Sequence, residues 1–169
     1  MNQITNTSRS AEFIRLVKHP VKFRMFLLFK LPSAFFSGVR IKDIDDNHCE
    51  VTVPYKWFSQ NPFRSVYFAC LAMGAEMSTG ALALTHLHKR EPRVSMLVTS
   101  LHASYFKKAT GLTSFTCEQG NDIKQTIQKA IDTGEPQQIT AKSTGRNEKG
   151  ELVAEFIIEW SFKRKNSKE

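Results

Sequence analysis

The chain has 169 residues, enough for one domain with its own hydrophobic core. Apolar residues make up 41% of it and charged residues 24%, ordinary values for a globular protein, while the net charge of +8 indicates an anionic partner: a phosphorylated ligand, a nucleic acid or a membrane surface. Cys49, Cys70 and Cys117 are far apart in the sequence and odd in number, and metal-ligand spacings are absent, which argues against a disulfide framework and a metal site and favours a reducing cytoplasm.

Two helical segments are predicted before the first strand. The first covers Glu12 to His19, and the second, VKFRMFLLFKL, lies between Pro20 and Pro32. The second segment is basic and apolar together. This composition favours a helix packed over the domain, and it leaves open peripheral contact with a lipid surface or a partner. We expect residues 1–37 to form an N-terminal helical extension.

From Gly38 onward the apolar residues alternate, which predicts strands. The expected strands cover residues 39–44, 48–53, 94–106, 112–118, 138–144 and 152–162. A small helix is expected from Asn121 or Asp122 to Gly134. We expect one domain over residues 38–163, followed by a basic tail, 164–169.

The strand over residues 94–106 is the longest of these. Strict alternation places one set of apolar side chains on one face, namely Val94, Met96 and Val98. It places a second set on the other face, namely Leu97, Leu101 and Tyr105. The sequence therefore predicts a strand with apolar residues on both faces.

A long apolar run, SVYFACLAMGAEMSTGALALTH, covers Ser65 to His86. It has the length of a membrane span, but Glu76 stands at its centre, which makes insertion unfavourable by about 3 kcal/mol. A helix that is apolar on every side is buried on every side. We therefore expect an antiparallel sheet curved around this helix, since hairpin connections place the later strands side by side.

Glu76 is the one formally charged residue between Arg64 and Lys89. Its helical face is almost entirely small, and no Lys or Arg lies within one turn to pair with it. One interpretation is structural: a side chain that reaches solvent or accepts bonds from backbone amides. The functional interpretation is a carboxylate with a shifted pKa in a dry groove, suited to act as a general base or nucleophile.

The segment before the long helix supplies two further groups. Asn61 precedes Pro62, where it acts either as a turn residue or as a functional amide. The free N–H groups of the first helical turn, around Val66 to Phe68, lie at the positive end of the helix dipole and can hold a developing oxyanion. A carboxylate, an amide and an oxyanion hole are suited to acyl transfer to water.

The order strand–strand–long helix–four strands resembles the hot-dog fold, an α+β fold in which a sheet of about six strands wraps around one central helix. The resemblance covers roughly Gly38 to Phe162. The segment NPFRSVYFACLAMGAEMSTG resembles the helix start of acyl-CoA thioesterases of the phenylacetyl-CoA and 4-hydroxybenzoyl-CoA type. In many of those an Asn is followed fifteen residues later by an Asp or Glu, as Asn61 is here by Glu76. The sequence of this segment is most similar to a bacterial branch of the superfamily whose substrates are largely unassigned.

The resemblance implies a mechanism. Glu76 would activate water or attack the thioester, Asn61 would orient the water or the thioester from the partner subunit, and the N–H of Phe68 would polarise the carbonyl. Thr79, Ser95 and Thr99 are candidates to complete the water site. Many relatives have His-Gly where this chain has Tyr67-Phe68, a departure that puts the activity in doubt more than the fold.

The resemblance also implies partners. We expect a cytoplasmic homodimer or tetramer, with active sites at the dimer interface, acting on acyl-CoA or an acyl-carrier protein. No cofactor is expected beyond the coenzyme A of the substrate, whose phosphates would meet basic residues, with Arg64 and Arg93 as candidates by charge.

Three alternatives remain open. A non-catalytic acyl-CoA or acyl-carrier sensor would keep the pocket and dispense with Glu76. A hot-dog dehydratase would need a histidine, and His102 could serve if the strand register allowed it. Nucleic-acid binding is disfavoured because the basic residues are scattered, without an aromatic-interleaved motif.

Overall fold

The structure is a computed structural model that describes residues 2–165, with side chains from residue 9 onward. Three helices come first, α1 (Asn2–Lys18), α2 (Pro20–Lys30) and α3 (Pro32–Ser37). The remaining elements are β1 (Arg40–Ile44), β2 (Cys49–Val53), the 3-10 turn η1 (Trp57–Ser59), α4 (Phe68–Leu87), β3 (Val94–Tyr105), β4 (Thr113–Cys117), α5 (Gly120–Thr133), β5 (Gln137–Asn147) and β6 (Leu152–Arg164).

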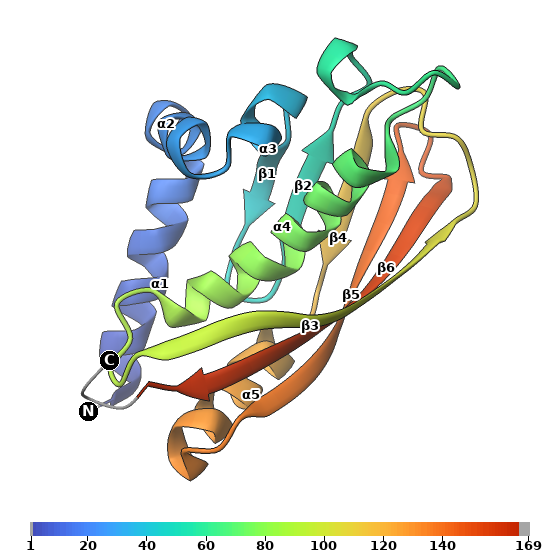
Figure 1. The fold of residues 1–169 in the computed structure, drawn as a ribbon. Helices are drawn as coiled ribbons and strands as arrows, with labels where there is room; N and C mark the ends of the chain where they lie inside the picture. The colour runs from blue at the N-terminus through green and yellow to red at the C-terminus, as the bar shows by residue number, and fades with distance from the viewer. Residues whose placement is uncertain (1, 166–169) are drawn as a thin grey trace.

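The strands form one six-stranded antiparallel sheet in the order β1-β2-β4-β5-β6-β3. Figure 1 shows this sheet curving around α4, with α1 and α3 against α4, while α5 contacts α4 as well as β5 and β6 and so packs on the same side of the sheet as α4. Strands β1 and β3 are the two edges. The six strands and the central helix are those that the sequence predicts.

Helix α4 is the core helix of the fold. Its length and composition would also suit a membrane span, but 67% of its apolar window is buried inside the protein. Gly74 lets the helix approach the sheet closely, because a Cβ there would lie 2.3 Å from a methyl of Val53 and 3.0 Å from Phe115. On β6, five alternating side chains are buried as expected: Ala154, Phe156, Ile158, Trp160 and Phe162.

The N-terminal extension is helical from Asn2, earlier than the predicted start at Glu12. The polar run 2–11 contains no Gly or Pro to interrupt a helix. Helix α2 lies between its two prolines as predicted. Strand β6 continues to Arg164, and residues 166–169 of the expected tail lie outside the described residues.

A β-bulge corrects the predicted faces of β3. The register of β3 against β6 shifts between Val98 and Ser100, so one extra residue enters β3 there. Leu101 and Tyr105 consequently pair with Ile158 and Ala154, on the same face as Met96 and Val98 rather than with Leu97. The alternation is broken because the bulge is set by pairing with β6, which the local pattern does not record.

Two cysteines that are far apart in the sequence meet in the sheet. Cys49 of β2 and Cys117 of β4 are directly opposite partners in the antiparallel ladder. Both are buried free thiols, as is Cys70. Burial raises the pKa of the Cys117 thiol to about 11, which leaves it protonated and unreactive at neutral pH.

Candidate active site

Glu76 lies on the face of α4 that is turned toward the N-terminal helices rather than toward the sheet. The side chain is half-buried, and its carboxylate has no hydrogen-bond or ion-pair partner among residues 9–165. Burial raises the pKa of this carboxyl above its ordinary value of 4.5. The structure thus favours a carboxylate that is partly desolvated and free to accept a proton.

An apolar cavity of about 130 Å³ lies beside Glu76, under the N-terminal helices. Glu76 is the one charged side chain in its wall. The other lining residues come from five elements and include Phe13 and Leu16 of α1, Phe23 and Phe26 of α2, Ile41 of β1, Gly80 and Leu84 of α4, and Met96 of β3. Such a cavity can hold an apolar group with its reactive end at a carboxylate.

A second cavity, of about 300 Å³, meets the same carboxylate from the turn between α2 and α3. Its wall contains Lys30 and Ser33 together with Glu76. Glu76, Leu31 and Met77 line both cavities. The carboxylate therefore stands where an apolar space meets a partly polar one.

The packing behind Glu76 fixes the position of its carboxylate. A Cβ on Gly80 would lie 3.1 Å from a carboxylate oxygen of Glu76 and 3.3 Å from the ring of Trp160, so glycine makes room for both groups. The indole N–H of Trp160 donates to the Thr79 hydroxyl at 3.0 Å. That hydroxyl donates to the backbone carbonyl of Glu76, also at 3.0 Å.

Thr79 is therefore occupied by contacts within the protein. It is fully buried, and its hydroxyl both accepts from Trp160 and donates to Glu76. In this arrangement the hydroxyl supports the helix backbone at Glu76. Its predicted part in a water site stays a prediction.

Asn61 organises the loop that leads into α4. Its side-chain oxygen accepts from the backbone N–H of Phe63 at 2.9 Å and from the hydroxyl of Ser65 at 3.2 Å, while its amide donates to the carbonyl of Val66 at 3.4 Å. This is the turn role that the sequence offered as one of two interpretations. Among the described residues, neither a contact nor a shared cavity joins Asn61 to Glu76.

The free amides predicted around Val66 to Phe68 are only partly present at the start of α4. The N–H of Val66 donates to the carbonyl of Ala109 at 2.8 Å and that of Tyr67 to the carbonyl of Ser59 at 2.7 Å, whereas the N–H of Phe68 has no acceptor among the described residues. Tyr67 is the residue before the helix, and no side chain caps this end. The rings of Tyr67 and Phe68 are exposed and contact each other edge to face at 4.8 Å. From Phe68 to Glu76 the helix rises by about 12 Å, so the two groups of one chain cannot contact the same carbonyl.

The predicted residues of β3 lie away from Glu76. The Ser95 hydroxyl donates to the carbonyl of Lys163 and the Thr99 hydroxyl to that of Glu159, both on β6. Ser95 points to the face opposite Met96, and Met96 is the β3 residue that lines the apolar cavity. Thr99 lies at the bulge, where two residues of β3 oppose one of β6.

His102 pairs with Ile157 and so occupies the sheet face away from α4. The register therefore does not bring it to Glu76 within one chain. Among the described residues, no group of three or more His, Cys, Asp or Glu side chains could hold a metal ion.

The two arginines predicted from charge lie far apart in the fold. Arg64 is exposed in the loop before α4, where it adopts a positive φ of 57°. Arg93 lies just before β3 and lines a cavity of about 480 Å³ together with Lys89, Arg90 and Lys165. That cavity shares Leu84 and Met96 with the apolar cavity, whereas Arg64 lines neither.

The residues that the sequence did not reveal are those of the N-terminal helices. Phe13, Leu16 and Phe26 line the cavity at Glu76, yet the sequence indicates only that their helices cover the domain. For Met96, the sequence indicated only that it shares a strand face with Val94 and Val98, not that it lines the cavity at Glu76.

Comparison with known proteins places the chain in a family. The sequence profile described as a domain of unknown function, DUF4442, matches residues 21–162. Curated protein sequences gave no match.

Solved structures share the fold at low sequence identity. PA5026 of Pseudomonas aeruginosa, described as a protein of unknown function and probable thioesterase, is 22% identical with a TM-score of 0.74, over 86% of this chain and 97% of that one. Thioesterase HI1161 of Haemophilus influenzae is 14% identical with a TM-score of 0.63, over 85% and 89%. A mutant of thioesterase PA1618 of Pseudomonas aeruginosa is 11% identical with a TM-score of 0.66, over 88% and 97%. The chain therefore belongs to the DUF4442 family and has the hot-dog fold.

Proposed function

We propose that this protein is a thioester hydrolase in which Glu76 is the catalytic carboxylate. The observation that carries the proposal is the unpaired, partly buried carboxylate at the junction of an apolar and a partly polar cavity. The fold is shared with proteins named as thioesterases, which supports the same reaction class. The substrate would be an acyl-CoA or an acyl-carrier protein.

The reaction needs only water and the thioester. As a general base, Glu76 takes a proton from water while the water oxygen adds to the thioester carbonyl. The resulting oxyanion is held by a backbone N–H at the start of α4, with Phe68 as the candidate. Collapse breaks the carbon–sulfur bond, and the leaving thiolate takes the proton from Glu76 to give a free thiol and a carboxylic acid. As a nucleophile, Glu76 would instead form an anhydride that water then hydrolyses.

Helix geometry favours a site shared between two subunits. The amide of Phe68 and the carboxylate of Glu76 are separated by about 12 Å of helix within one chain. In a homodimer or tetramer, the helix start and Asn61 of one subunit could serve Glu76 of the other. The exposed edge strand β3, with Leu97 66% exposed, is a suitable place for such an interface.

The fold and its free thiols are consistent with a cytoplasmic enzyme. Peripheral membrane contact through the N-terminal helices remains part of the proposal. Helix α2 exposes Val21, Met25 and Phe29 next to Lys22 and Lys30, a combination typical of helices that lie on anionic lipid.

A sensor that binds an acyl thioester without cleaving it is the second candidate. The Tyr67-Phe68 pair supports it, because the two exposed rings flank the amides that would hold the oxyanion. Release of free thiol from a panel of acyl-CoAs, measured beside their binding affinity, separates the two functions. Turnover supports the hydrolase, whereas binding without turnover of acyl-CoA or acyl-carrier thioesters supports the sensor.

A further inference from the structure

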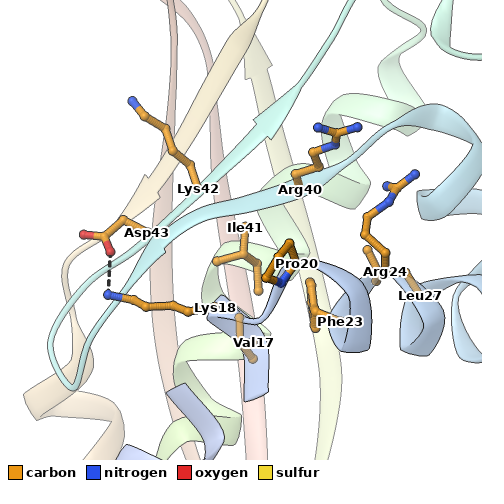
Figure 2. A pocket seen from close by; sticks show the side chains of 10 residues that line it. All are labelled: Val17, Lys18, Pro20, Phe23, Arg24, Leu27, Arg40, Ile41, Lys42 and Asp43. Carbon is orange, nitrogen blue, oxygen red and sulfur yellow. Dashed lines mark ion pairs between the residues drawn. The ribbon is translucent and has the colours of Figure 1, made fainter. Parts of the chain in front are cut away.

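A cavity of about 470 Å³ lies between α2 and β1, next to the end of α1. Four cations line it, two from the N-terminal helices and two from the edge strand: Lys18, Arg24, Arg40 and Lys42. Asp43 is the one acid in its wall. Figure 2 shows the guanidinium groups of Arg24 and Arg40 pointing to the same side of the cavity.

Two of these cations are neutralised and two are not. Lys18 pairs with Asp43 at 2.9 Å, and Lys42 pairs with Glu50 at 3.0 Å. Among residues 9–165, Arg24 and Arg40 have no carboxylate partner. The cavity therefore presents two uncompensated positive charges from different elements.

Arg24 is the more constrained of the two. Its Nη1 is buried without a hydrogen-bond partner, and its guanidinium lies over the ring of Phe35 at 4.1 Å from the ring centre. Burial and the nearby Arg40 lower the pKa of Arg24. A buried donor without an acceptor beside a like charge is unfavourable in an empty site, and an anion would relieve both problems.

The cationic cavity adjoins the apolar one, because Val17, Phe23 and Ile41 contribute to the walls of both. Helix α2 rises by about 10 Å from Arg24 to Leu31, the residue that meets Glu76 in the apolar cavity. A ligand that spans this distance would need an anionic head, a flexible linker and an apolar or reactive tail.

We propose that Arg24 and Arg40 form a binding site for the phosphate groups of an amphiphilic ligand whose tail enters the cavity at Glu76. The forked guanidinium donors match phosphate oxygens in a bidentate manner. The diphosphate of coenzyme A, a phosphopantetheine arm and a phospholipid headgroup share this chemistry. That the ligand is the substrate rests on the proposed function, whereas the phosphate site itself does not. This site is distinct from Arg64 and Arg93.

The test compares Arg24→Gln and Arg40→Gln with Lys22→Gln, which removes an exposed charge from the same helix outside the cavity. Isothermal titration with coenzyme A and with inorganic pyrophosphate measures affinity. We expect each arginine variant to weaken both ligands by about tenfold or more, with Lys22→Gln within about twofold of the wild type. Equal losses in all three variants, or none, would overturn the site.

Folding is controlled by a second measurement. Because the unliganded protein buries an unpaired donor at Arg24, the melting temperature of Arg24→Gln should not fall below that of the wild type. Pyrophosphate should raise the melting temperature of the wild type and leave that of Arg24→Gln unchanged. Arg24→Lys keeps the charge without the fork and should bind with intermediate affinity; affinity equal to the wild type contradicts the bidentate arrangement.

Vesicles identify the source of the phosphate. A lipid headgroup is identified if the protein binds phosphatidylglycerol but not phosphatidylcholine vesicles, if this binding depends on Arg24 and Arg40, and if coenzyme A does not bind. The thioester substrate is identified if binding of coenzyme A depends on the two arginines. If the protein hydrolyses no thioester but its affinity for phosphate ligands depends on the two arginines, the proposed function is contradicted and the phosphate site is not. If both arginine variants hydrolyse the thioester with an unchanged KM, the assignment of this site to the substrate is contradicted and the proposed function is not.

Discussion

At the scale of the single residue, the proposed hydrolysis depends on Glu76. It is recognisable in the sequence because it is the one charge in a long apolar run, and the structure gives it a cavity on each side and no partner among residues 9–165. What the sequence could not supply is the identity of those walls. They come mainly from α1, α2, β1 and β3, which are distant from Glu76 in the sequence, so no local pattern records that they meet it.

The pH dependence of kcat/KM should report the raised pKa of Glu76. A base must be deprotonated, so activity should fall with decreasing pH through a midpoint above 4.5, the ordinary value for a glutamate. A midpoint at or below 4.5 would contradict a desolvated base. The measurement is thiol release at saturating and limiting substrate across the acid range.

The free energy of unfolding should also depend on the protonation of Glu76, but in the opposite direction: the protonated form that is inactive as a base is the more stable one. Because the folded pKa is raised, the folded protein binds the proton more tightly than the unfolded chain, and stability falls as pH rises from 4.5 through the raised pKa. Glu76→Gln should therefore be more stable than the wild type at pH 7.5, with a difference that shrinks near pH 4.5. Urea unfolding at both values checks this, and an equal difference at the two pH values contradicts it.

Thr79 makes packing contacts that its residue type does not predict. The family resemblance makes it a candidate for a water site, and in the structure its hydroxyl accepts from the indole N–H of Trp160 and donates to the backbone carbonyl of Glu76. Thr79→Val should destabilise the protein by about 1–3 kcal/mol, because the buried indole N–H loses its acceptor. Thr79→Ser, which keeps the hydroxyl, should lose clearly less stability in the same urea titration; equal losses would refute the bond.

At the scale of elements, the strands and α4 could be predicted because their period and length are local properties of the sequence. The bulge in β3 could not be, since it exists only through the register with β6. It turns Leu101 and Tyr105 toward the core side, and Met96, not Ser95, reaches the cavity. The sequence therefore pointed to Glu76 on α4, but it did not indicate which residues of the other elements line the cavity beside it.

Helix α1 should control the size of acyl group that the cavity accepts. The cavity of about 130 Å³ is bounded by Phe13, whose ring also contacts His88. Phe13→Ala should enlarge it and shift the kcat/KM optimum toward longer acyl chains. Phe36→Ala, an exposed aromatic residue outside this cavity, is the control. An unchanged chain-length profile in a folded Phe13→Ala protein would mean that acyl groups bind elsewhere.

At the scale of the whole molecule, the surface suggests an assembly. The edge strand β3 exposes Leu97 and Leu101, and Phe106 directly after it is exposed too. The separation of Phe68 from Glu76 along α4 means that a site using both groups needs a second subunit. We expect a dimer or tetramer by size-exclusion chromatography with light scattering. Leu97→Lys should shift the protein toward monomer and reduce activity together.

Val21→Lys is the matched control for that variant, because Val21 is similarly exposed on α2. It should leave the oligomeric state unchanged. A wild-type protein that is monomeric and active would remove the need for a shared site, and Glu76 would then act with groups of its own chain.

The measurement that tests the account most directly is thiol release by the wild type, Glu76→Gln and Glu135→Gln with the best acyl thioester. Gln keeps the volume of the side chain and removes the base, and Glu135 is an exposed carboxylate remote in sequence from the cavity walls. The account predicts a loss of about 100-fold or more in kcat for Glu76→Gln, with a cooperative unfolding transition retained, and no loss for Glu135→Gln. Wild-type activity in a folded Glu76→Gln protein would contradict it.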